Sequence, residues 1–279
     1  TDWAAGLSVE SPHPQGIEDA AGIAYQLLSR LDHYSQEDSL EAVLQVVVKI
    51  PTGDIEAFAA LARRASLADN EDKVASDFAK LLLTGIYGMF ACMDAPDVVI
   101  ALAETYYKES GEGDLQFGYS HLPEIESVFG LNSDLQFEFS VSSALRGPFL
   151  PLLRYHPVKG ARFILDLLNY ACEKFAQRHR TMQHVEGPRE VSLSFPDGTT
   201  RKQWCEERLW ALYRGTTVAP GVLQCALMAL EAWLLQIGEQ NSECLEEWLI
   251  YLARESNNVA VTAVVASVAT AFPNAAGKA

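Results

Sequence analysis

The sequence predicts an all-α fold: a HEAT-like or armadillo-like α-solenoid of antiparallel helix pairs with one inserted β-hairpin at about residues 190–204. Three observations favour this fold. Apolar residues recur at three- and four-residue spacing along most of the chain. Residues 220–237 are apolar on nearly every side, which is typical of a helix buried all round. Helix pairs recur at intervals of about 35 to 45 residues, as in such solenoids, although no strict sequence repeat is present.

Residues 17–108 carry the pattern of successive helices, after an irregular start at 1–16. The expected ranges are 17–34, 40–50, 54–65, 72–93 and 96–108. Pro51 ends the second helix because a proline disfavours the helical conformation of the residue before it, whereas Pro96 suits the first turn of the fifth. Gly85 and Gly88 lie inside the fourth helix. Each costs about 1 kcal/mol relative to alanine, so they indicate close helix packing or a kink.

The helical pattern weakens between residues 109 and 132, where glycines and prolines leave room only for short helices. Residues 133–145 then carry two competing signals. Leu135, Phe137 and Phe139 stand at every second position, which is typical of a strand. Ser133 is nevertheless a suitable helix cap, and we favour a helix for this segment.

The second half returns to clear helical spacing. The expected ranges are 158–178, 206–213, 220–237, 243–254 and 259–272. Pro157 opens the first of these helices, and Gly215 ends the second. Pro220 and Gly238 mark the two ends of the central helix, residues 220–237.

One β element is expected between these helices. Residues 190–195 (EVSLSF) and 199–204 (TTRKQW) flank a Pro-Asp-Gly turn at 196–198, whose chemistry suits a hairpin. Because a two-stranded hairpin is marginal by itself, it must pack on helices, with Trp204 or Phe195 as its anchor.

Charge divides the chain into two regions. Residues 1–146 hold 24 Asp and Glu against 8 Lys and Arg, whereas residues 147–279 hold 13 of each, so the net charge of −16 belongs to the first region. We therefore expect an acidic helical region at 1–146 and a neutral helical-repeat region with the hairpin at 147–279, in one continuous solenoid. The acidic region argues against a broad nucleic-acid surface and is compatible with a basic protein partner. The alternative is a solvated acidic surface that keeps the chain soluble.

Cysteine usage and the chain ends bear on the cellular location. The five cysteines are scattered, four of them within helical patterns, and residues 1–16 lack the basic start and apolar run of a signal peptide. Residues 220–237 are short for a membrane span. These features indicate a reduced, cytoplasmic protein with no membrane segment. Since the chain begins at Thr1 and ends without a polar tail, we expect it to be a piece of a longer protein.

The common catalytic motifs are missing from the sequence. It holds no phosphate-binding loop, no dinucleotide-binding glycine pattern, no HExxH and no GxSxG. The cysteines form no CxxC pair, so a structural zinc site is not expected. We therefore assign no catalytic residue, no metal and no cofactor. An enzyme would need a site assembled from scattered residues, such as His156, His179 and His184 with nearby arginines.

Basic residues gather between the end of the 158–178 helix and the second strand of the hairpin. This candidate binding patch consists of Arg178, His179, Arg180, Arg189, Arg201 and Lys202. Such a patch could hold a phosphate, an acidic peptide or the acidic region of the same chain, and the alternative is ordinary surface charge.

A second candidate segment, at residues 109–126, carries negative charge. Glu109, Glu112, Asp114, Glu124 and Glu126 are carboxylates that could bind Ca²⁺, but the loop pattern of alternating ligands with a terminal Glu is missing. A solvated loop is the interpretation that we favour.

Three stretches carry a family resemblance. They are residues 144–157 (ALRGPFLPLLRYHP), 209–215 (LWALYRG) and 226–235 (ALMALEAWLL). Over about residues 144–272 the chain resembles the helical-repeat regions of large bacterial multidomain ATPases of the STAND type, which act in phage defence. The resemblance implies that the ATPase module lies elsewhere in the parent protein and that this piece is a sensor, scaffold or interdomain segment. Because the chain has no phosphate-binding loop, no catalytic residue of that family can be assigned to it.

Together these features predict a non-enzymatic helical scaffold or sensor segment that contacts a protein partner or sibling domains of the same polypeptide. Two alternatives stay open: an enzyme with a site built from scattered His and Arg residues, and a weak nucleic-acid-binding module that uses residues 178–202.

Overall fold

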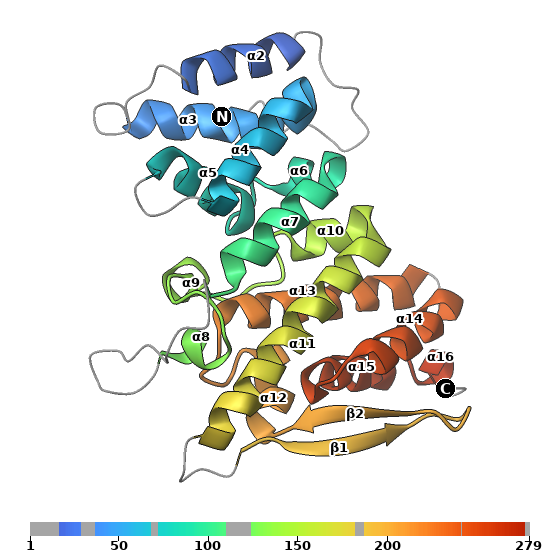
Figure 1. The fold of residues 1–279 in the computed structure, drawn as a ribbon. Helices are drawn as coiled ribbons and strands as arrows, with labels where there is room; N and C mark the ends of the chain where they lie inside the picture. Colours follow the sequence, from blue (N-terminus) through green and yellow to red (C-terminus); the bar gives the residue numbers. More distant parts are fainter. Residues whose placement is uncertain are drawn as a thin grey trace.

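Helices make up most of the chain in the computed structural model, which describes residues 17–28, 37–67, 72–109, 124–181, 187–240 and 242–276. Within these ranges the strands form a single two-stranded antiparallel sheet. The mostly helical fold with one small hairpin, as the sequence predicted, is confirmed. In Figure 1 the first helices lie at the top, α13 crosses the middle and the hairpin lies at the bottom.

The acidic region begins with a stack of helices. They are α2 (Ile17–Leu28), α3 (Glu37–Lys49), the 3-10 turn η1 (Pro51–Asp54), α4 (Ile55–Leu67), α5 (Lys73–Leu83), α6 (Met89–Asp94) and α7 (Pro96–Tyr107). α2 packs on α3, α3 on α5, and α4 on both α5 and α7. α3 ends at Lys49, just before Pro51, as expected, and Pro51 opens η1. Pro96 stands at the first turn of α7, as expected. Residues 29–34, part of the first expected helix, lie outside the described residues.

The single long helix expected at residues 72–93 is wrong. The structure has two helices there, α5 and α6, separated by a turn at residues 84–88. The hydroxyl group of Thr84 donates to the carbonyl oxygen of Lys80 (2.8 Å) at the end of α5. The chain then turns back so closely that a Cβ atom on Gly88 would lie 2.2 Å from the carbonyl oxygen of Leu82. Gly88 therefore permits this tight return, which a continuous helix does not need.

The helix favoured for residues 133–145 is also wrong beyond its first turn. After α8 (Ile125–Val128), α9 spans only Leu135–Glu138, and residues 139–148 form turns and bends. The reason lies in contacts with a distant helix. The hydroxyl group of Ser142 donates to the side-chain oxygen of Gln224 (2.5 Å), and the backbone N–H of Ser143 donates to the sulfur of Cys225 (3.3 Å). These contacts replace the bonds of a helix or a strand.

The second half is built around α13. Its elements are α10 (Phe149–Tyr155), α11 (Pro157–Thr181), α12 (Glu207–Ala211), η2 (Leu212–Arg214), α13 (Gly221–Gln240), α14 (Ser242–Glu255), α15 (Val259–Ala271) and α16 (Pro273–Ala276). α13 packs against α10, α11, α14 and α15, so its burial on several sides is confirmed.

The expected end of the central helix at Gly238 is wrong, because α13 continues to Gln240. A Cβ atom on residue 238 would lie 2.5 Å from the ring of Phe272, so Gly238 makes room for that ring instead of ending the helix. By length and composition α13 is the one helix of the described residues that could cross a membrane. Its mean hydropathy is 1.4, but 61% of that window is buried within the protein, as in the core helix of a soluble protein.

The hairpin forms where the sequence predicted it. β1 (Arg189–Ser194) pairs with β2 (Thr200–Cys205), with Glu190 opposite Trp204 and Ser192 opposite Lys202. The turn places Gly198 at a φ of 81°, a left-handed conformation that glycine adopts without strain. The backbone N–H of Trp204 donates to the carbonyl oxygen of Asn257 (2.7 Å), so the hairpin lies against the turn between α14 and α15.

One apolar core runs through both charge regions. Tyr107 at the end of α7 is fully buried, and its hydroxyl group donates to the carbonyl oxygen of Leu83 (2.8 Å). Its ring lies 5.9 Å from those of Phe139 and Phe149 and 6.4 Å from that of Phe163, measured between ring centres. Residues before and after position 146 thus share one packed interior.

Candidate binding site

The predicted basic patch starts at the last turn of α11. Arg178, His179 and Arg180 all belong to that turn, although of their side chains only that of Arg178 is described. The guanidinium group of Arg178 donates to the carboxylate of Glu109 (2.5 Å) and to the carbonyl oxygen of Ser127. Both charged side chains are mostly buried, at 14% and 17% exposed. The structure therefore brings Arg178 to the acidic region of the same chain, one of the three partners that the sequence left open for this patch.

The other basic residues lie on the hairpin. Arg189 begins β1, where it also makes a contact within the chain, and Arg201 and Lys202 lie on β2. The guanidinium group of Arg201 donates to the carbonyl oxygens of Glu255 and Ser256 (both 3.3 Å), at the end of α14. A cation is favourable there because the carbonyl groups at a helix C-terminus carry partial negative charge.

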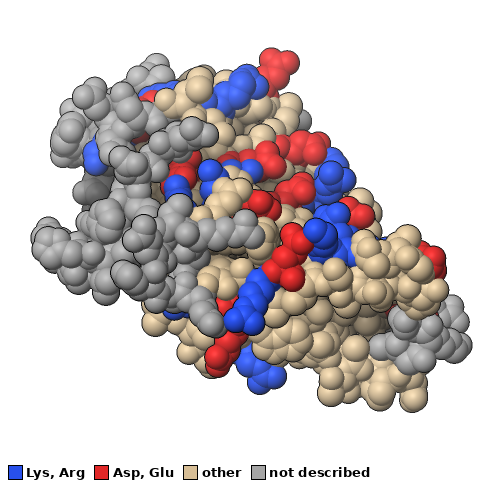
Figure 2. All heavy atoms as spheres, turned by 60° about the horizontal axis from the view of Figure 1, so that its bottom comes forward, with Lys and Arg blue, Asp and Glu red and all other residues tan. Residues whose placement is uncertain are grey.

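Lys202 Nζ lies 2.6 Å from the carboxylate of Glu190 on the neighbouring strand. Because successive residues of a strand point to opposite faces, Lys202 and Arg201 do not share a face. On the face in Figure 2, positive and negative side chains lie next to each other along a band and not in a separate basic area. Anion binding by the patch stays a prediction.

The turn between α14 and α15 holds a polar cluster that the sequence did not reveal. The side-chain oxygen of Asn169 accepts from the backbone N–H of Asn257 (2.9 Å) and from the side-chain amide of Asn258 (3.0 Å). The indole N–H of Trp204 and the amide of Asn257 both donate to the carboxylate of Glu173 (3.3 and 3.4 Å). These bonds position the hairpin. The sequence showed Asn257 and Asn258 only as a turn, because their partners lie more than 80 residues away in α11.

The acidic segment proposed for Ca²⁺ is described only in part, since Glu112 and Asp114 lie outside the described residues. Glu126 in α8 is 2% exposed, and one of its carboxylate oxygens is buried without a hydrogen-bond partner. Burial, together with the nearby carboxylate of Glu124, raises the pKa of Glu126 above its usual value. No group of three or more His, Cys, Asp or Glu side chains within the described part of the chain is placed to hold a metal ion.

The structure describes only some of the residues from which an enzyme site could be built. A ring nitrogen of His156 lies 2.7 Å from the carbonyl oxygen of Met93, so His156 joins the end of α10 to α6. The side chain of His179 and all of His184 lie outside the described residues. Burial raises the pKa of the Cys92 and Cys172 thiols, which holds both in the protonated form that is a poor nucleophile.

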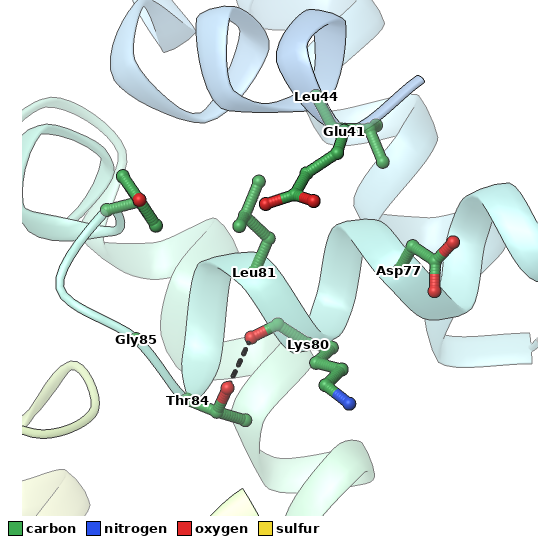
Figure 3. A pocket seen from close by; sticks show the side chains of 8 residues that line it. Glu41, Leu44, Asp77, Lys80, Leu81, Thr84 and Gly85 are labelled. Atoms are coloured by element: carbon green, nitrogen blue, oxygen red, sulfur yellow. Dashed lines mark hydrogen bonds between the residues drawn. The ribbon is translucent and has the colours of Figure 1, made fainter. Parts of the chain in front are cut away.

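A pocket of about 340 Å³ lies between α3, α5 and the turn that follows α5. Figure 3 shows its walls and the directions of its side chains. Its lining residues are Glu41, Leu44, Asp77, Lys80, Leu81, Thr84, Gly85 and Tyr87. The volume is at the lower end of the range for ligand pockets, so it suits a small group.

Charged and apolar groups meet in this pocket. The carboxylate of Glu41 points inward above Leu81, whereas the side chain of Lys80 points outward (Figure 3). Lys80 Nζ lies 2.7 Å from the carboxylate of Glu138, so its charge is already paired. Tyr87, one of the lining residues, has Lys49 Nζ over its ring, 5.2 Å from the ring centre. The sequence did not reveal this site, because Glu41 and Leu81 belong to different helices and only the break after α5 brings the 84–88 turn beside them.

Comparison with known proteins adds no relative. No family model matches the chain, and no curated protein matches it. The resemblance to helical-repeat regions of STAND ATPases therefore stays a prediction, and the function is argued from the geometry.

Proposed function

We propose that this chain is a non-enzymatic helical scaffold, or sensor segment, that binds a protein with a basic surface or a basic sibling domain of the same polypeptide. The observation that carries the proposal is the excess of exposed carboxylates on the acidic region. Among the described residues of that region, Glu41, Asp54, Glu56, Glu104 and Asp134 are all exposed.

The cations of the same region are too few to offset this charge, since residues 1–146 hold 8 Lys and Arg against 24 Asp and Glu. Arg64 is paired with Asp72 (2.5 Å), and Lys80 is paired with Glu138 (2.7 Å). Lys49 and Lys108 lie over tyrosine rings, at 5.2 and 5.0 Å from the ring centres. The acidic region thus carries an excess of negative charge, which attracts a basic partner and raises the rate of association.

The packing of neighbouring helices also supports a scaffold. Helices that follow one another in sequence pack as pairs, α2 on α3, α4 on α5, α10 on α11 and α13 on α14. We propose that these pairs form a HEAT-like or armadillo-like solenoid, because stacked pairs expose the long surfaces that such proteins use for binding. In keeping with the resemblance to STAND ATPases, we place the scaffold in the cytoplasm, where it would serve as a sensor or interdomain segment in phage defence.

The test is affinity capture from an extract of the native cells, with bound proteins, nucleic acids and small molecules all identified. We expect one stoichiometric protein, whose capture falls steeply as salt is raised from about 0.05 M to about 0.5 M. The triple variant Glu56→Gln, Glu104→Gln, Asp134→Asn should lose that protein.

A matched control removes three exposed carboxylates from the neutral region: Asp166→Asn, Glu207→Gln, Glu247→Gln. This control variant should capture the partner as well as the original chain does. Recovery of a nucleic acid or a metabolite in place of a protein, or equal losses in the two variants, would overturn the proposal.

A further inference from the structure

We propose that the pocket between α3 and α5 binds the ammonium end of a lysine side chain on the partner. This inference deepens the proposed function, because it takes the lysine to come from the proposed protein partner. The chemistry of the pocket is independent of the proposed function and can be measured on this chain alone.

The size of the pocket fits a single side chain. Its volume of about 340 Å³ is small for a nucleotide or another large ligand, which occupies the upper part of the usual range. Leu44 and Leu81 form apolar walls. Such walls suit the four methylene groups of lysine, which packs its stem on apolar surface while its charged end reaches polar groups.

The charge of the pocket selects a cation. The carboxylate of Glu41 points into the pocket. It accepts a hydrogen bond from the side-chain amide of Gln45 (3.1 Å), which is uncharged and leaves the negative charge of Glu41 in place. The hydroxyl group of Thr84 donates its proton to the carbonyl oxygen of Lys80 (2.8 Å). The Thr84 oxygen can therefore act only as an acceptor toward a ligand. An entering ammonium group has three donors and no acceptor, so the Glu41 carboxylate suits it as a partner. An anion would meet the Glu41 carboxylate and be repelled.

One lining residue, Tyr87, already contacts an ammonium group. Lys49 Nζ lies 5.2 Å from the centre of the Tyr87 ring, a cation–π contact. The positive charge of Lys49 beside this ring opposes the entry of a second cation. Removing that charge should therefore strengthen binding, whereas removing the charge of Glu41 should weaken it.

The experiment is a titration followed by amide NMR shifts, with Nα-acetyl-lysine methylamide as the probe. We expect shifts confined to residues 41–49 and 77–88, with a millimolar Kd, as befits a fragment of this size. The norleucine analogue, which lacks the amine, should bind at least about tenfold more weakly. Glu41→Gln should lower the affinity roughly five- to tenfold, and Lys49→Met should raise it about two- to fivefold, since one charge contact is lost or relieved in each.

Glu247→Gln is the matched control, because Glu247 is also an exposed helical glutamate but lies in α14 and does not line the pocket. It should leave the Kd unchanged. Glu41→Gln should keep the melting temperature of the original chain, because Glu41 is exposed and its hydrogen bond is to a neighbour one turn away. Equal binding of lysine and norleucine probes, or no effect of Glu41→Gln, would overturn the inference.

Two further outcomes separate this inference from the proposed function. Capture of a salt-sensitive partner by both the original chain and Glu41→Gln, without probe binding, would leave the scaffold standing and refute the pocket. Pocket-specific probe binding without any captured protein would support the ammonium chemistry and refute the scaffold. If 1,4-diaminobutane binds a hundredfold or more tightly than the lysine probe, a free diamine is the ligand and the assignment to a partner lysine is wrong.

Discussion

At the scale of single residues, the buried carboxyl group of Glu126 is the clearest conflict between a charge and its surroundings. Its pKa is raised first by burial and then by the carboxylate of Glu124. The folded protein therefore holds the proton of Glu126 more tightly than the unfolded chain does. The stability that comes from this proton is fully present below the pKa of the unfolded chain and is lost as the pH rises through the folded pKa.

This predicts a pH-dependent effect of Glu126→Gln, which mimics the protonated carboxyl group. Near pH 4, where a glutamate in an unfolded chain is largely protonated, the variant should be about as stable as the original chain. At about pH 7 the variant should be the more stable of the two, because it avoids ionising a buried group. Urea unfolding at several pH values checks this. A variant that is less stable at neutral pH would show that the ionised carboxylate has a partner that stabilises it.

At the scale of elements, the hairpin depends on contacts outside itself. A two-stranded hairpin is marginal alone, and here β2 is held by the α14–α15 turn and by α11. Asn169 is central to this attachment. It accepts from Asn257 and Asn258 and also donates to the carbonyl oxygen of Glu255 (3.0 Å).

We expect Asn169→Leu, which has the same branched shape without the polar atoms, to cost about 2–3 kcal/mol of unfolding free energy, because it leaves donors and acceptors without partners. Hydrogen exchange of the β2 amides should accelerate more than that of α13, since the hairpin loses its attachment before the core opens. Equal acceleration in both elements would mean that Asn169 supports the whole fold and not the hairpin in particular.

The sequence predicted the boundaries of helices and strands correctly where neighbouring residues determine them. Pro51, Pro96 and the turn at 196–198 set boundaries through their own backbone chemistry, and those boundaries hold in the structure. The predicted boundaries are wrong where contacts with residues far away in the sequence determine the structure. The break at Gly88 follows from the close return of the chain onto α5, and the irregular course after residue 138 follows from bonds to α13.

The site was harder to predict than the fold for the same reason. Arg178 and Arg201 were recognisable as basic residues, but their partners, Glu109 and the end of α14, are far away in sequence. The pocket could not be expected at all, because it needs the turn at 84–88 that the sequence showed as helix.

At the scale of the whole molecule, the uneven charge opposes folding. The net charge of −16 comes from residues 1–146, and folding brings these carboxylates closer together. We expect the melting temperature to rise by several degrees between about 0.02 M and about 0.5 M NaCl, because salt screens their repulsion. Scanning calorimetry in NaCl and in choline chloride at matched concentrations checks this, since screening depends on ionic strength and not on the particular cation. A fall in melting temperature would show that the internal ion pairs outweigh the repulsion.

The rings around Tyr107 cross the border between the acidic and the neutral region. Phe139 lies before that border, and Phe149 and Phe163 lie after it. A gene divided between codons 146 and 147 would separate side chains that fill one another's space, and each fragment would present a broad apolar surface to water. The unit that can be exchanged between proteins by recombination therefore contains both regions, whatever their difference in charge.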